Sequence, residues 1–244
     1  MPQVYEAGCR TFLVSNVDAA KPFGDCNVVL VEDTTKGMQL LAKYYLEKLN
    51  LKKVTVTGSV GKTSTRDMVH SILSEKYKTG ATVGNLNSDW GVPLTIFSFD
   101  DSMEAAVLEI GMDQFGEIHR LVNIIRPEVV LITNVGISHV ENLGSREGIL
   151  QAKMETVDFF DEDNTLVINQ SNDMLSTVES DTYRIIRVGL EPEADYYVHD
   201  IIDHGDKGVD YVLTVKADRK TYPVHLDIPG AHNALNSAMA LAGC

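Results

Sequence analysis

The chain has 244 residues, a formal net charge of −14 at pH 7 and only three cysteines. This length accommodates one large domain, or one domain and part of another. The acidic balance argues against a nucleic-acid partner, because binding to phosphate backbones needs a basic face. The cysteines are far apart and include no Cys-x-x-Cys pair, so the sequence indicates neither a disulfide framework nor a zinc site.

No apolar run approaches the length of a membrane span, and no signal peptide precedes the first predicted strand. We therefore expect a cytoplasmic protein that is not inserted in a membrane. The negative net charge is also explained simply by a surface that keeps the protein in solution.

The first 50 residues do not have the pattern of a complete domain. Short strands of the buried type are predicted at residues 11–14 and 28–31, and two strands cannot enclose a core. A helix follows the two strands and leads to a domain boundary near residue 50. Thr34 is its expected N-cap, and its predicted buried stripe consists of Met38, Leu41, Tyr45 and Leu49.

A short β-branched run at residues 54–57 ends in a glycine turn that opens into a helix, which is the layout of a phosphate-binding loop, or P-loop. Backbone N–H groups between Gly58 and Lys62 can converge on phosphate oxygens, because the glycines leave the approach open. Lys62 supplies a charge for the outer phosphates, and the Thr63 hydroxyl is placed to ligate Mg²⁺. The full motif has a glycine where this chain has Val56, so a glycine-rich turn with an incidental lysine is the alternative.

Beyond the P-loop, strands and helices alternate, which predicts an α/β fold with a mostly parallel, doubly wound sheet. Ligands of such sheets bind at the carboxyl ends of the strands, where the P-loop falls. Three later segments have period two and predict a small antiparallel subsheet with hairpins. The predicted strands are 105–110, 129–133, 165–168 and 184–188, then 196–202, 209–216 and 222–228 in the subsheet; the predicted helices are 114–125, 145–160 and 232–241.

Polar residues follow several strand ends, where the fold would aim them at a nucleotide. Glu109 ends a buried strand, and a buried carboxylate is costly unless it is paired, bound to metal or satisfied by a neighbouring turn. His139 follows another strand, where a metal-ligand role and ordinary structural hydrogen bonding are equally supported. Lys153 lies in a predicted helix and, from the residues alone, is a solvated lysine. Residues 84–93 form a turn-rich loop of the kind that often holds ligands.

An ordered series of motifs resembles the Mur ligase family. The series covers nearly the whole chain from about residue 28 and is far more specific than any one motif. It is most similar to the branch that joins D-alanyl-D-alanine to a UDP-muramoyl-tripeptide. The motifs lie at residues 57–64, 84–93, 108–112, 133–141, 144–148, 152–155 and 232–236.

The resemblance implies a three-domain, ATP-dependent ligase of peptidoglycan precursor synthesis. In such enzymes the γ-phosphate is transferred to a substrate carboxylate, and the incoming amine displaces phosphate to form a peptide bond. The implied cofactors are ATP and two Mg²⁺ ions, which reduce the repulsion between carboxylate and triphosphate. The implied partners are UDP-muramoyl-peptide and D-Ala-D-Ala, with no nucleic acid, and we expect a monomer.

The resemblance also implies roles for individual residues. The catalytic residues would be Lys62, Glu109, His139 and Lys153, and the metal ligands Thr63, Glu109, His139 and a carbamylated Lys153. Substrate-binding residues would be Asn85, Asn87 and Ser88. ATP-binding residues would be Gly58, Ser59, Val60, Gly61, Lys62, Thr63 and Ser64, with His232, Asn233 and Asn236 on the adenine side.

Two departures from the family pattern affect the substrate loop. Ser88 stands where an asparagine is usual, and Trp90 replaces an aliphatic residue. Residues 1–50 are expected to be the remnant of the N-terminal UDP-substrate domain with a linker helix, and residues 51–244 the central ATP-binding domain. The C-terminal ligase domain is expected to be absent, so we expect this chain to bind ATP and to be inactive alone.

Other functions compete with this one. A ligase of the folylpolyglutamate or cyanophycin synthetase type would add an amino acid to a different carboxylate. A non-ligase P-loop NTPase or kinase would bind nucleotide without needing Glu109 or His139. A non-catalytic subunit would keep a vestigial site, but the cysteine spacing does not support the zinc ribbon of that branch.

Overall fold

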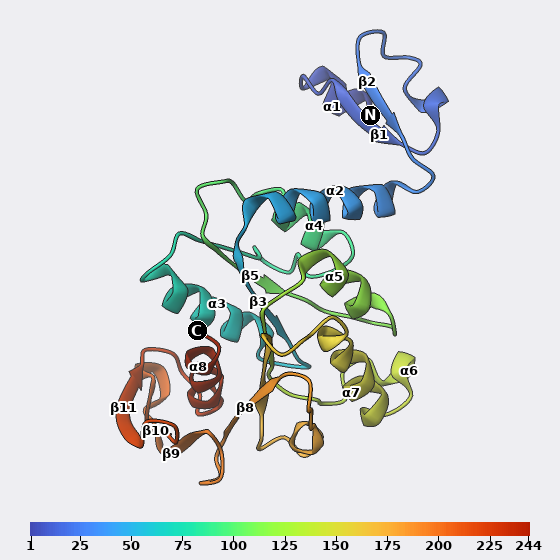
Figure 1. The fold of residues 1–244 in the computed structure, drawn as a ribbon. Helices are drawn as coiled ribbons and strands as arrows, with labels where there is room; N and C mark the ends of the chain where they lie inside the picture. The colour runs from blue at the N-terminus through green and yellow to red at the C-terminus, as the bar shows by residue number, and fades with distance from the viewer.

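The computed structural model describes all residues of the chain, 1–244. Figure 1 shows that the residues before α2 form a small unit apart from the main body. In this unit α1 (Pro2–Glu6) accompanies a two-stranded parallel sheet of β1 (Thr11–Val14) and β2 (Asn27–Leu30), with the 3₁₀ turn η1 (Val17–Ala19) between the strands. Both predicted strands are confirmed to within one residue.

Helix α2 (Thr34–Leu49) leads from this unit to the main body, and its N-cap corrects the prediction of Thr34. The cap is Asp33, whose carboxylate accepts hydrogen bonds from the backbone N–H groups of Thr35 (2.8 Å) and Lys36 (3.1 Å). A carboxylate satisfies the free N–H groups and also interacts favourably with the positive end of the helix dipole.

The buried face of α2 confirms the predicted stripe in part, because Tyr45 and Leu49 pack against the core. Leu41 is 54% exposed, whereas Ala42 and Leu46 are buried and belong to the core. Apolar residues occur around most of this helix, so their spacing does not select one face.

The main body is built on one nine-stranded sheet with the order β11-β10-β9-β8-β7-β6-β3-β5-β4. The strands from β3 to β9 are parallel, and β10 and β11 continue the same sheet as antiparallel hairpins. The predicted fold class is therefore confirmed. The strands are β3 (Lys52–Thr57), β4 (Thr79–Ala81), β5 (Ala105–Glu109), β6 (Val129–Ile132), β7 (Thr165–Asn169), β8 (Arg184–Gly189), β9 (Tyr196–Asp203), β10 (Val209–Val215) and β11 (Lys220–Leu226).

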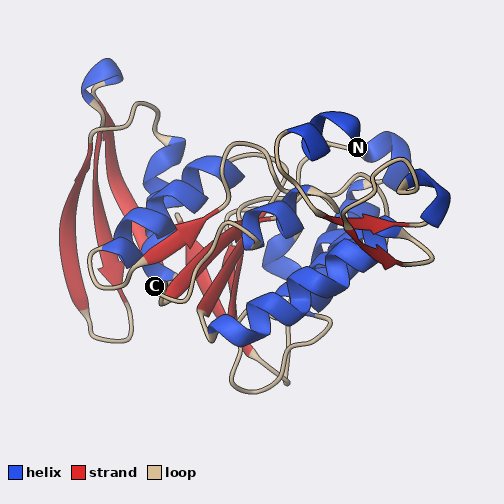
Figure 2. Cartoon of the chain, turned by 90° about the horizontal axis from the view of Figure 1, so that it is seen from above, coloured by secondary structure: helices blue, strands red, loops and turns tan.

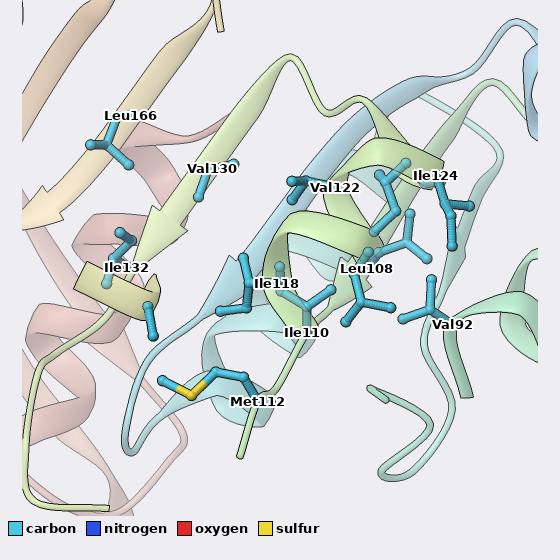
Figure 3. Packing of buried hydrophobic residues seen from close by; sticks show 14 of the residues in the cluster. Val92, Leu108, Ile110, Met112, Ile118, Val122, Ile124, Val130, Ile132 and Leu166 are labelled. Carbon is cyan, nitrogen blue, oxygen red and sulfur yellow. The ribbon is translucent and has the colours of Figure 1, made fainter. Parts of the chain in front are cut away.

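Helices cover both faces of the sheet. One core joins the sheet to α3 (Lys62–Ser74) and α8 (His232–Ala242), and the other joins it to α2, α4 (Gly91–Ile96), α5 (Glu117–Ile125) and α7 (Arg146–Met154). Neighbouring residues of β5 serve opposite cores, because side chains alternate along a strand. Val107 belongs to the core on the α3 side. Leu108 belongs to the core on the α5 side, and Figure 3 shows it among the residues of that core.

The remaining elements are short. They are α6 (Val140–Leu143) and the 3₁₀ turns η2 (Glu155–Val157), η3 (Leu175–Thr177) and η4 (Gly205–Lys207). Figures 1 and 2 place the β9–β11 extension and the N-terminal unit at opposite ends of the molecule. None of the helices combines the length and apolar character that a bilayer span requires.

The periodicity argument missed β4 and α4, as well as the short helices α1 and α6. Strand β4 has only three residues, and Gly80 at its centre is required because a Cβ there would overlap Phe99 and Met103. Helix α4 begins inside the segment that was predicted to be a loop, residues 84–93, where Gly91 packs against the backbone of Leu86. Both β4 and α4 depend on close tertiary contacts, which a local sequence pattern does not reveal.

The buried β5 core gives a direct test of this architecture. Replacing the fully buried Leu108 by alanine is expected to lower the free energy of unfolding by about 2–5 kcal/mol, because transfer energy is lost and a cavity is left. Urea denaturation followed by circular dichroism measures this. The control is Leu40→Ala at a position 68% exposed, which should change stability by no more than about 0.5 kcal/mol. Equal effects of the two substitutions would contradict the assigned core.

Candidate active site

The P-loop connects β3 to α3 at the point where the order of the sheet reverses, since β5 and β6 lie on opposite sides of β3. Gly58 has a φ of +149° and no space for a side chain, because a Cβ would overlap Thr133 Oγ1. Gly61 has a φ of +82° and is the N-cap of α3. The glycine spacing noted in the sequence therefore reflects a backbone that other residues adopt only with strain.

The start of α3 presents free donors. The backbone N–H groups of residues 61–64 have no acceptor in the protein, and the first N–H of the helix to be satisfied is that of Thr65, which donates to the carbonyl of Gly61. These N–H groups and the positive end of the helix dipole favour an anion such as phosphate. Lys62 adds a cation at the same place, and its Nζ donates to the carbonyl of Gly58 at 2.9 Å.

The segment after β6 holds the loop in shape. Asn134 Oδ1 accepts hydrogen bonds from the backbone N–H groups of Ser59 (3.0 Å) and Val60 (2.9 Å). Thr133 Oγ1 donates to the carbonyl of Val60 at 2.6 Å. The N–H groups of Ser59 and Val60 are thus engaged by the protein itself in this structure. Asn134 was not among the predicted site residues, although it lies in one of the quoted motifs.

The Glu109 carboxylate contacts side chains from two other segments of the site. Its side chain is 2% exposed, and one carboxylate oxygen accepts from Thr63 Oγ1 (2.9 Å) and lies 3.3 Å from Arg66 Nη1. The other oxygen accepts from Asn87 Nδ2 at 2.7 Å. The predicted alternative, a carboxylate satisfied only by a neighbouring turn, is excluded, because its partners come from α3 and from the loop after β4.

Lys153 is buried in α7, with 3% of its surface exposed, and it is not a solvated lysine. Burial, and to a lesser degree repulsion by Lys62, lowers the pKa of its amine to about 7. It forms no salt bridge in the structure. A substantial fraction of this amine is therefore neutral at pH 7 and able to act as a nucleophile.

His139 lies on the open side of the site. Its backbone is left-handed, with a φ of +65°, and its Nδ1 lies 2.8 Å from Asp113 Oδ1. The imidazole is half exposed and lines a cavity of about 290 Å³ together with Lys62, Asn87 and Ser88. The cavity thus brings together four predicted site residues. A larger cavity of about 660 Å³ lies at the opposite edge of the sheet, beside Leu51, and contains none of them.

The start of α8 reaches the P-loop through one residue. The Asn236 side chain lies where a Cβ on Gly61 would meet its Oδ1 at 3.1 Å. Asn236 Nδ2 donates to Asn233 Oδ1 (3.1 Å), and Asn233 Nδ2 donates to the carbonyl of Pro229 (2.8 Å). Asn233 is buried, so it supports Asn236, while His232 is exposed at the first position of the helix.

The donor set suits a magnesium ion that is shared with phosphates. The Thr63 hydroxyl and the Glu109 carboxylate meet at 2.9 Å, and such oxygen ligands are those that Mg²⁺ prefers. No three His, Cys, Asp or Glu side chains converge as a full protein cage would require. This also fits Mg²⁺, which usually takes one or two protein ligands and completes its shell with waters and phosphate oxygens.

Comparison with known proteins gives consistent matches. Residues 56–244 match the family model described as the Mur ligase middle domain. The chain is 36% identical over 240 residues to the UDP-N-acetylmuramoyl-tripeptide--D-alanyl-D-alanine ligase of Bacillus subtilis, covering 98% of this chain and 51% of that protein.

Solved structures agree. A crystal structure of MurF from Acinetobacter baumannii superposes with a TM-score of 0.88 at 29% identity, covering 99% of this chain and 52% of that one. MurF from Thermotoga maritima in complex with ADP gives 0.84 at 25% identity, covering 97% and 60%. This chain therefore spans about half the length of the Bacillus relative, and it belongs to the Mur ligase family, whose middle domain it matches over most of its length.

Proposed function

We propose that this chain is the ATP-binding part of a ligase that adds D-alanyl-D-alanine to UDP-N-acetylmuramoyl-tripeptide through an acyl-phosphate intermediate. The observation that carries the proposal is the convergence of two elements, the P-loop helix α3 and the loop after β4, on Glu109 at the end of β5. The identity to the Bacillus ligase, whose name states this reaction, supports the choice of substrates.

The chemistry requires a carboxylate to attack a polyanion. The free N–H groups at the start of α3 and the Lys62 cation would hold the phosphates and spread their charge. Thr63 and Glu109 would hold one Mg²⁺, and His139 would contribute to a second ion beside the cavity. When bound, Mg²⁺ would neutralise charge on the transferring phosphoryl group.

The cavity beside the P-loop is the proposed place for the substrate carboxylate. Asn87 and Ser88 line it from the loop after β4, and Lys62 lies on its wall. A carboxylate there would lie beside the same cation that holds the outer phosphates. Asn85 is exposed and does not line this cavity, so its proposed substrate contact would have to be made from the outer part of the loop.

We also propose that Lys153 is carbamylated. Its neutral amine would form an N–C bond to CO₂ and release one proton, which converts a cation into a carboxylate-like anion. Burial without an anionic partner, next to Lys62, supports this, because the modification replaces a repulsive pair by an attractive one.

We propose a division of the chain into two domains near residue 50. Residues 51–244 would be the central ATP-binding domain, and residues 1–50 would be the remnant of an N-terminal UDP-substrate domain with its linker helix. Ligation also needs a substrate site and closure over the nucleotide. We also propose that this chain binds ATP as a monomer and does not ligate alone.

Dipeptide-dependent phosphate release tests the reaction. A full-length protein that contains this chain should release phosphate from ATP only when UDP-muramoyl-tripeptide and D-Ala-D-Ala are both present. The chain of 244 residues should release none. Release that depends on a folate or on another carboxylate instead would favour the folylpolyglutamate or cyanophycin synthetase type, and nucleotide hydrolysis without any amine would favour a P-loop NTPase.

ATP binding by the present chain tests the site residues. Lys62→Ala and Glu109→Gln are each expected to weaken Mg²⁺-dependent ATP binding by about 10- to 100-fold, because a phosphate-binding charge or a metal ligand is lost. Isothermal titration calorimetry with and without Mg²⁺ measures this. Lys76→Ala, at an exposed position after α3, serves as the control. Binding that is indifferent to Glu109 would rule out its role as a metal ligand.

The lowered pKa of Lys153 predicts how stability depends on pH. From pH 7 to 10.5 the Lys153 amine is more fully protonated in the unfolded chain than in the folded one, so its contribution to the free energy of unfolding rises with pH. Between pH 7 and 9 the wild type should gain about 2 kcal/mol relative to Lys153→Met, which lacks this titration. Urea denaturation in CO₂-free buffer measures the difference.

The matched control for this measurement is Lys36→Met at an exposed position of α2. Its stability should follow the wild type across the same pH range. A Lys153→Met variant that also follows the wild type would show that the Lys153 amine keeps an ordinary pKa in the folded protein.

A further inference from the structure

Arg66 is a buried cation for which the sequence predicted no role. It lies on α3 one turn after Thr63, and its side chain is 6% exposed. Its guanidinium has acceptors on two sides. Nε and Nη2 donate to Asp67 Oδ1 (2.9 and 2.7 Å), while Nη1 donates to the carbonyl of Gly84 (2.8 Å) and lies 3.3 Å from Glu109 Oε2.

Nη1 of Arg66 faces two parts of the site at once. One is Glu109 Oε2, the same oxygen that accepts from the Thr63 hydroxyl. The other is the carbonyl of Gly84, at the start of the loop after β4. A planar guanidinium fixes the direction of its donors, so it holds both acceptors in one geometry.

The far end of that loop is tied to the same carboxylate. Asn87 Nδ2 donates to Glu109 Oε1, and the carbonyl of Asn87 accepts from the N–H of Gly111, just beyond β5. Residues 84–87 are therefore held between Arg66 and Glu109. Trp90, the single tryptophan of the chain, follows three residues later and lines the cavity.

We propose that Arg66 is a positioning residue that links the cation site to the substrate loop. It orients the Glu109 carboxylate toward the Thr63 hydroxyl, and it fixes the loop that carries Asn87. Cation binding at Glu109 and the position of the loop are then coupled. This inference rests on the proposed function, because it assumes that Thr63 and Glu109 hold Mg²⁺ beside ATP.

Removing Arg66 has two effects on the affinity for Mg²⁺, and they have opposite signs. Loss of a cation close to the site would strengthen Mg²⁺ binding, because it removes repulsion. Loss of the hydrogen bonds that orient a ligand would weaken it, and substitutions of such supporting groups typically cost about 10- to 100-fold in metal affinity. The proposal requires orientation to dominate, so the sign of the change decides the question.

The test measures the Mg²⁺ concentration that gives half-maximal ATP binding, by calorimetry at a series of Mg²⁺ concentrations. Arg66→Met should raise that concentration about tenfold or more. Arg66→Lys keeps the positive charge but lacks the planar set of guanidinium donors, so it should raise that Mg²⁺ concentration by a smaller factor. The matched control is Arg187→Met, because Arg187 Nη2 also donates to one carbonyl, of Val178 (2.7 Å), and one carboxylate, of Glu179 (3.0 Å), away from the site.

Trp90 fluorescence supplies the second readout, which a purely structural role would not change. Addition of Mg²⁺ and ATP should shift the Trp90 emission in the wild type and in Arg187→Met, and the shift should be lost in Arg66→Met. Circular dichroism establishes that each variant is folded. If Arg66→Met does not fold, Arg66→Lys carries both measurements.

The outcomes separate the inference from the proposed function. An equal or lower Mg²⁺ requirement in a folded Arg66 variant, or an unchanged Trp90 response, would overturn the inference alone. Absence of any Mg²⁺-dependent ATP binding by the wild type would overturn the assigned cation site, and the inference with it.

Discussion

The carboxylate of Glu109 is the constraint on which the site depends. It is almost fully buried, and a buried charge is stable only when it is paired and hydrogen-bonded. Its partners are a hydroxyl and a guanidinium from α3 and an amide from the loop after β4. One side chain at the end of β5 thus fixes the relative positions of the P-loop helix and the loop after β4. Without Glu109, no shared side chain would link the P-loop helix to the loop after β4.

The order of the strands makes this convergence possible. Because β5 and β6 flank β3, the segments that follow all three strands meet at one edge of the sheet. The segment after β3 is the P-loop, the end of β5 supplies Glu109, and the segment after β6 supplies Thr133 and Asn134, which hold the loop. Strand β5 anchors this edge, because its side chains point alternately into the cores on the two faces of the sheet.

The sequence predicted much of the fold and of the candidate site, and what it missed has physical causes. Glycines that need a positive φ, a lysine and a threonine in register, and β-branched strands are local signals, so the P-loop and most strands were predicted. Arg66 has no such signal: a helix arginine is exposed by default, and only the fold shows that Glu109 and Gly84 lie within its reach. Asn134 was missed for the same reason.

The balance of charge explains why the site is suited to an anion. Arg66 pairs with the buried Glu109 carboxylate, and Lys62 lies close enough to the buried Lys153 to repel it, although the chain as a whole has a net charge of −14. Arg66 is neutralised by Glu109 and Asp67, which leaves the repulsion between Lys62 and Lys153 uncompensated. Phosphate oxygens at the start of α3 would relieve that repulsion from the Lys62 side and raise the pKa of Lys153. Carbamylation would relieve it from the Lys153 side by reversing the charge. Both responses follow from one feature of the fold, the burial of Lys153 beside the Lys62 cation.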